Sequence, residues 1–170
     1  NCGAPAPSAP NTLEMVMLLN ATGTTATQIA YKGGGPAMIG LLGNEVQWMF
    51  TTFSSAVSYA KQNRIRMLAV VSPERNPVLP EIPTMREQGF NMTAGAWHGV
   101  FVPMGTPQSV VSKLYKISVD MMKDAQVIKR LGESGVTIVT SKSPADFTAF
   151  VTAETERFGK VIKDSGIKPD

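Results

Sequence analysis

A run of three glycines followed by a proline constrains the fold of this chain more than any other feature. The stretch from Tyr31 to Ala37 reads YKGGGPA and lies between a β-like run at 28–31 and a short apolar segment at 38–42. Glycine permits positive φ angles and a close approach of backbone to ligand, and Pro36 suits the first position of a helix. The pattern predicts a strand, a glycine turn and a helix start, which is an α/β arrangement.

The start of this predicted helix is a candidate anion site. The first N–H groups of a helix have no intrahelical acceptor, and the helix dipole favours negative charge beside them, so backbone donors alone can hold a carboxylate, phosphate or sulfate. Neither a P-loop nor a G-x-G-x-x-G turn matches the spacing of the glycines, which argues against a nucleotide. From the turn alone, a tight βα turn without a ligand is the slightly favoured interpretation.

The remaining pattern alternates strands and helices in the first half of the chain. Residues 1–10, rich in Pro, Ala and Ser, are expected to form a connector, and residues 72–83 a proline-punctuated loop too long for a simple turn. Further strands are predicted at 46–50, 67–71, 97–103 and 136–139. Helices are predicted from 11 or 12, at 55–62, from 84 to 89, from 107, at 125–133 and from 143 or 144.

Composition excludes several classes of function. The chain of 170 residues is 43% hydrophobic, enough for a core in one domain or two small lobes. Its net charge of +3 is spread along the sequence without a basic block, so no nucleic-acid partner is expected. The only histidine is His98 and the only cysteine is Cys2, near the start of the chain. We therefore expect no catalytic residues, no metal site and no cofactor.

Five motifs, taken in order, resemble one known family. They are YKGG at 31–34, LAV at 68–70, LPEIPT at 79–84, WHGVFVPMGTP at 97–107 and FGKVI at 158–162. With this set the chain resembles the tripartite tricarboxylate transporter substrate-binding proteins, often called Bug receptors. The resemblance covers nearly the whole chain.

The resemblance implies a two-lobed α/β fold of the Venus-flytrap type that closes over a small solute without catalysis. Residues 1–10 would then be the crossover between lobes, residues 11–94 the second lobe, and residues 95–170 the return segment and C-terminal helices of the first lobe. The family also implies a bacterial periplasmic receptor that works with membrane transporter subunits. On this interpretation the first part of lobe one, with its secretory signal peptide, precedes the residues in hand.

The family likeness also places the solute. The implied binding loop comprises Tyr31, Gly33, Gly34, Gly35, Pro36 and Ala37, whose backbone amides receive a solute carboxylate. A second implied loop contains Thr51 and Thr52, and many relatives carry Asp where this chain has Thr51. Ser72 is a third candidate because ligands bind at the carboxyl ends of strands in open α/β sheets, although a turn-capping serine explains it equally well. The expected solutes are di- or tricarboxylates, aromatic acids or acidic amino acids.

Three other residues have two interpretations each, and a fourth, Trp48, has one. Lys32 could pair with a carboxylate or be solvated, and Trp97 could stack on a solute or fill the space between lobes. His98 could touch the solute, but a partly buried structural histidine is favoured, and Trp48 is expected in the core.

Two other classes of protein are compatible with the sequence pattern. A ligand-sensing domain of a regulator would share the two-lobed pattern, and an upstream helix-turn-helix would distinguish it from a secreted receptor. An enzyme on a doubly wound fold would need its catalytic residues elsewhere.

The apolar helix stripes within residues 97–170 lack a predicted covering sheet. We expect either a chain that supplies the missing lobe or self-association.

Overall fold

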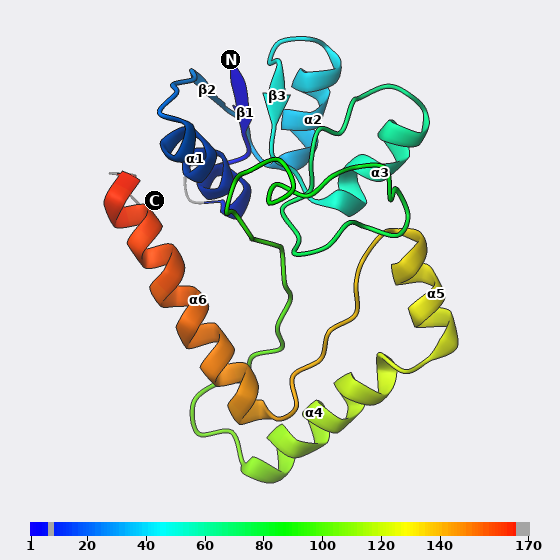
Figure 1. The fold of residues 1–170 in the computed structure, drawn as a ribbon. Helices are drawn as coiled ribbons and strands as arrows, with labels where there is room; N and C mark the ends of the chain where they lie inside the picture. The colour runs from blue at the N-terminus through cyan, green and yellow to red at the C-terminus, as the bar shows by residue number, and fades with distance from the viewer. Residues whose placement is uncertain (7–8, 166–170) are drawn as a thin grey trace.

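A small parallel sheet organises the first third of the chain (Figure 1). The structure is a computed structural model that describes residues 1–6 and 9–165. Its sheet contains β1 (Cys2–Ala4), β2 (Gln28–Ala30) and β3 (Trp48–Met49) in the order β2-β1-β3. Cys2 lies opposite both Gln28 and Trp48, so the two outer strands run parallel to β1 and start at the same level.

The central strand of this sheet lies in residues that were expected to form a connector. That prediction was wrong for Cys2–Ala4, whose side chains are buried and whose strand pairs on both edges. Three small residues are too short a run for an alternating pattern to be recognised. Cys2 is fully buried, and burial raises the pKa of its thiol. This correction concerns the secondary structure of residues 2–4, and the proposed boundaries of the two lobes stay a prediction.

Helices cover the two faces of the sheet. On one face, Met15 of α1 (Pro10–Thr22) packs against Cys2 and Ala4, with Leu19, Trp48 and Phe50 around them. On the other face, α2 (Gly34–Leu42) contacts β1 and β3. Gly3 faces this side, where a Cβ atom would lie 3.3 Å from the Val46 side chain. The small residues of β1 thus bring helices and sheet close together.

The helices lie close to the predicted positions. In order they are α3 (Phe53–Lys61), α4 (Gln108–Met121), α5 (Ala125–Glu133) and α6 (Pro144–Ser165). Figure 1 shows α4, α5 and α6 extending away from the sheet as an open frame, with the end of α6 returning beside α1. Arg157 of α6 donates from Nη1 to the carbonyl oxygen of Thr93 over 3.1 Å, which ties this return to the preceding loop.

Three predicted strands, at 67–71, 97–103 and 136–139, do not form, and this is a correction. Among the described residues the first makes only an isolated bridge between Val70 and Thr84, and the other two pair with nothing. A strand needs a neighbouring strand, and the sequence pattern reports only apolar character. That character is exposed here, since Leu68 is 70%, Phe101 67% and Val139 86% accessible.

The short helix predicted from Thr84 is also absent. Thr84 and Glu87 form the reciprocal bonds of a helix start, in which each side chain accepts from the backbone N–H of the other. Gly89 then takes a φ of 88° and ends the segment after turns alone. The capping signal for a helix start is present, but the turn at Gly89 follows before a helix forms.

Candidate functional site

The loops that follow the three strands lie at one edge of the sheet. Because β1, β2 and β3 are parallel and paired at the same level, the chain leaves each of them on the same side. Neighbouring strands lie about 4.8 Å apart, so the loops after β2 and β3 are separated by roughly 10 Å. The N–H of Gly33 donates to the carbonyl oxygen of Pro5 over 2.9 Å and joins the first two loops.

The glycine loop has the predicted order of strand, turn and helix. The residue that turns the chain and the first residue of the helix differ from those predicted. Only Gly33 has a positive φ, at 107°, and it is the residue that precedes α2. The helix begins at Gly34, so Pro36 is its third residue and not its first, as was predicted. Within the described part of the chain, the N–H groups of Gly34 and Gly35 have no acceptor. These two exposed donors are the candidates of the loop for holding an anion.

Two residues of the predicted loop have structural tasks. Tyr31 lies across Gly40 of α2, where a Cβ atom would approach its hydroxyl to 2.2 Å, and this hydroxyl donates to Glu45 over 3.0 Å. Ala37 is completely buried, and its N–H donates to the carbonyl oxygen of Gly33. Both residues therefore hold the loop against α2, and their part in binding a solute stays a prediction.

The second predicted loop begins α3. Thr52 precedes this helix, and its carbonyl oxygen accepts the N–H groups of Ser55 and Ala56. Its hydroxyl is hydrogen-bonded to that of Ser55 over 2.7 Å. Thr51 is half-buried, and among the described residues its hydroxyl has no partner. Thr51 is thus the side chain of this loop that is available to a solute.

Ser72 opens a loop whose two ends meet. Its hydroxyl donates to the carbonyl oxygen of Glu74 over 2.6 Å. The N–H of Val70 donates to Pro83, and the N–H of Met85 donates back to Val70, so the chain closes on itself around residues 72–83.

Gly135 brings this loop beside the second one. The Asn76 amide donates to the carbonyl oxygen of Gly135 over 2.7 Å. A Cβ atom on Gly135 would lie 2.3 Å from the ring of Phe53, the first residue of α3. Gly135 has a φ of 71°, which favours glycine at this contact. The loop at 72–83 and the first residue of α3 therefore both contact Gly135.

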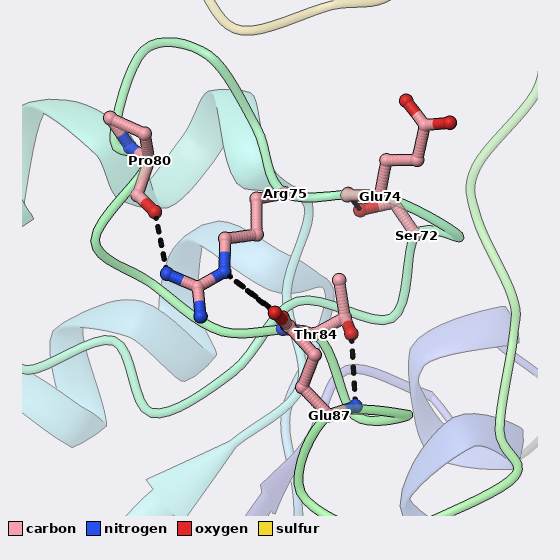
Figure 2. Close-up of polar contacts among 6 residues, drawn as sticks. All are labelled: Ser72, Glu74, Arg75, Pro80, Thr84 and Glu87. Carbon is pink, nitrogen blue, oxygen red and sulfur yellow. Dashed lines mark hydrogen bonds and ion pairs between the residues drawn. The ribbon is translucent and has the colours of Figure 1, made fainter.

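An arginine and a glutamate that the sequence analysis did not single out fasten the loop at 72–83 (Figure 2). The Nε atom of Arg75 lies 3.0 Å from each carboxylate oxygen of Glu87, and its Nη1 donates to the carbonyl oxygen of Pro80 over 3.0 Å. The N–H of Thr84, followed by the hydrogen bond from Arg75, holds the pKa of Glu87 below its usual range. The Thr84-x-x-Glu87 spacing of a capping box was a readable signal for the glutamate.

The four residues that the sequence left as further candidates are either packed against other side chains or exposed to solvent. Trp97 packs edge-on against Phe147 and Phe150 of α6, with ring centroids 5.9 and 5.3 Å away. His98 is exposed, so the expectation of a partly buried histidine was wrong, because the segment around it has no covering layer. Trp48 packs at the core as expected, and Lys32 is exposed. Across residues 1–6 and 9–165, no cluster of His, Cys, Asp or Glu is arranged to hold a metal ion.

Comparison with known proteins identifies the family. A family model described as the tripartite tricarboxylate transporter family receptor matches residues 1–167. The chain belongs to this receptor family. Among curated relatives, it is 33% identical over 153 residues to a protein from the TAR-I ttuE-ttuC' intergenic region of Agrobacterium vitis, which covers 88% of this chain and 44% of that protein.

Solved structures of the receptor family have the same fold. The periplasmic binding protein BugD is 30% identical, with a TM-score of 0.89 over 99% of this chain and 57% of its own. MatC from Rhodopseudomonas palustris, solved with bound malate, is 27% identical, with a TM-score of 0.85 over 95% of this chain and 56% of its own. The α/β periplasmic-binding-protein fold expected from the sequence is thereby confirmed, and the neighbours are solute-binding receptors and not enzymes.

The chain spans about half the length of the three relatives named above. Receptors of the family are periplasmic, as the description of BugD states for that protein. Within the described residues, none of the helices combines the length and the apolar character needed to cross a lipid bilayer.

Proposed function

We propose that this chain is part of a periplasmic receptor that captures a small carboxylate solute and delivers it to a tripartite tricarboxylate-type membrane transporter. The observation that carries the proposal is the pair of backbone donors at Gly34 and Gly35, which open α2 behind the sharp turn at Gly33. A solute carboxylate has two oxygens, which match two adjacent N–H groups at the positive end of a helix dipole.

The surroundings of these donors support an anion as the ligand. A Cβ atom at Gly34 or Gly35 would meet nothing within 4 Å, so the space above both residues is open to a ligand. Thr51 offers a neutral hydroxyl, and neither the stretch from Tyr31 to Ala37 nor the pair Thr51 and Thr52 contains a carboxylate side chain that would compete with the solute. MatC, a neighbour of similar fold, has malate bound. A dicarboxylate of this size is the proposed class of solute.

Delivery follows from closure of two lobes over the solute. A bound solute favours the closed form by the difference in its contacts between closed and open forms, and a transporter that recognises the closed form receives a loaded receptor. The proposed lobe boundaries, at residues 10 and 94, place all three candidate loops in one lobe. The transporter subunits and the signal peptide are part of this proposal.

The exposed apolar surface has a proposed occupant of its own. It comprises the extended segment at 97–104 and the exposed side of α4, with Val100, Phe101, Met104, Val110, Ile117 and Met121. The Agrobacterium vitis relative and BugD are each about twice as long as the region they share with this chain, and BugD matches nearly all of this chain. We propose that a segment corresponding to the rest of such a receptor covers this surface and supplies strands that pair with residues 97–103.

The experiment that tests the function is a titration of the complete receptor with carboxylates, monitored by tryptophan fluorescence. Thermal unfolding is then measured with each carboxylate that binds. The panel contains malate, succinate, adipate, citrate, benzoate and glutamate. A solute at a hundredfold its Kd stabilises the folded state by about 2.7 kcal/mol, which is a measurable rise in Tm. Saturable binding of one carboxylate is the expected result. A folded receptor that binds none of them contradicts the proposal.

A further inference from the structure

Helix α6 lies across the proposed boundary between the two lobes. Its first half packs through Phe147 and Phe150 against Trp97, which follows the boundary at residue 94 and belongs to the first lobe. Its second half returns beside α1 of the second lobe, as Figure 1 shows. Movement of one lobe relative to the other therefore has to change the contacts at one end of α6.

Arg157 fastens the second half of α6 with one guanidinium group. Its Nε and Nη2 donate to the two carboxylate oxygens of Glu154, each over 2.8 Å, and its Nη1 donates to the carbonyl oxygen of Thr93 over 3.1 Å. Thr93 lies in the second lobe, next to the boundary, so the bond from Nη1 joins α6 to that lobe. The first end of α6 is held by aromatic packing, whereas this end is held by groups that respond to charge.

Two carboxyl groups lie near this arginine. Glu154 is ionised, since the hydrogen bonds from Arg157 hold its pKa below its usual range. Glu14 of α1 is buried, which raises its pKa to about 7, and the Asn11 bond and the Arg157 charge lower it only in part. Within the described part of the chain, Arg157 is the charged group that acts on Glu14, while Asn11 on its own helix is neutral. The junction is thus electrically balanced only while Glu14 keeps its proton.

We propose that Arg157 is a positioning residue of lobe movement, which fastens α6 to the second lobe as long as Glu14 is protonated. Loss of that proton leaves a buried negative charge without a counterion of its own, because Arg157 is committed to Glu154. Release of α6 from α1 exposes the charge to water. This inference rests on the proposed function and adds to it a control of lobe movement by pH.

The size of the effect follows from the two pKa values of Glu14. The fastened form has a pKa of about 7, and exposure to water restores the ordinary value of 4.5 in the released form. The contribution to fastening is complete below pH 4.5 and is lost as the pH rises through 7. Between pH 6 and pH 8 the ratio of fastened to released receptor should fall about tenfold.

A distance between α1 and α6 measures this ratio directly. Spin labels are placed in the complete receptor through Thr22→Cys and Lys163→Cys, at exposed positions of the two helices. The native thiol of Cys2 is completely buried, so the labels go to the introduced cysteines. Pulsed electron resonance without solute should show a short and a long distance, with a short-to-long ratio that falls about tenfold from pH 6 to pH 8.

Three variants separate the roles of charge and geometry. Glu14→Gln should keep the ratio constant with pH, whereas Glu156→Gln, an exposed change on α6, should follow the wild type. Arg157→Lys keeps the positive charge but lacks the planar fork that bonds Glu154 twice while it reaches Thr93, so it should lower the ratio at both pH values. The Tm of each variant verifies that it is folded.

Solute affinity tests whether this junction controls closure. A change in the equilibrium between two lobe arrangements alters the affinity for every solute by the same factor. Isothermal titration with malate and adipate, which both stay ionised from pH 6 to pH 8, should therefore show one common factor for the two solutes. Glu14→Gln should remove this pH dependence.

Each outcome decides one question. A distance ratio that is constant with pH, or an Arg157→Lys variant that matches the wild type, overturns the inference while the receptor function stands. A ratio that changes while both affinities stay constant also overturns it, because the junction then does not control closure. If the folded receptor binds no carboxylate, the proposed function fails, and the distances still report on the junction.

Discussion

Glu14 of α1 gives the sharpest prediction for stability. Its side chain is only 4% exposed, and its one hydrogen bond among the described residues is a 3.4 Å contact from the Asn11 amide. Burial raises its pKa from the ordinary value of 4.5 to about 7, and the Asn11 bond and the charge of Arg157 lower it only in part. Folding therefore favours the protonated carboxyl.

The sign of the pH dependence follows from this direction. Below pH 4.5 the carboxyl is protonated in both states, and its stabilising contribution is complete. Between pH 4.5 and about 7 the unfolded chain loses the proton while the folded chain keeps it, so stability falls. Above pH 7 both states are ionised, and the loss stays at about 3 kcal/mol.

The substitution Glu14→Gln removes this loss, because a neutral amide of the same shape keeps an oxygen for Asn11. Urea unfolding of the variant and the wild type at several pH values gives the difference between their free energies of unfolding. We expect this difference to shift in favour of the variant by about 3 kcal/mol from pH 4 to pH 8. Glu156→Gln, an exposed change on α6, is the control and should follow the wild type. A difference that stays constant over this range would falsify the argument from burial.

Three further predictions concern the glycines and the apolar surface. Gly34→Val should abolish carboxylate binding in titration with little loss of Tm, since its Cβ meets nothing in the folded chain; unchanged affinity contradicts the site. Gly135→Ala should destabilise the chain by about 1–3 kcal/mol in urea unfolding, because of its positive φ and the Phe53 ring; an unchanged midpoint argues against this contact. The 170-residue chain alone should self-associate in light scattering through its uncovered apolar surface, whereas a monodisperse monomer that melts cooperatively counts against the proposed covering segment.

The sequence predicted elements whose signals are local. The glycine turn, α3, α5 and the start of α6 each follow from turn residues, caps or helical spacing within the element itself. Asp124 illustrates this, since its carboxylate accepts the N–H groups of Gln126 and Val127 at the start of α5. Such contacts lie within a few residues of one another and are readable without the rest of the fold.

Strands were predicted less well, because a strand depends on a partner. The apolar run at 67–71 has a strong strand pattern but makes a single bridge, while Cys2–Ala4, with no pattern, is the centre of the sheet. The candidate site shows the same limit. The loop at 31–37 was found from its glycines, but the link from Arg75 to Pro80 and Glu87 depends on how the loop turns back, which spacing does not reveal.

The proposed function assigns attraction of the solute and selection among solutes to different parts of the chain. In the proposed function the N–H groups of Gly34 and Gly35 receive any carboxylate, because backbone donors carry no information about the rest of the solute. The same proposal leaves selection to the candidate side chains of Thr51 and Ser72, which lie on other loops and can change without altering the turn at Gly33. Changes at Thr51 or Ser72 should therefore alter the ranking of solutes, whereas changes at Gly34 should weaken all of them together. Titration of these variants with one carboxylate panel measures both patterns, and a Gly34 variant that changes only the ranking contradicts the division.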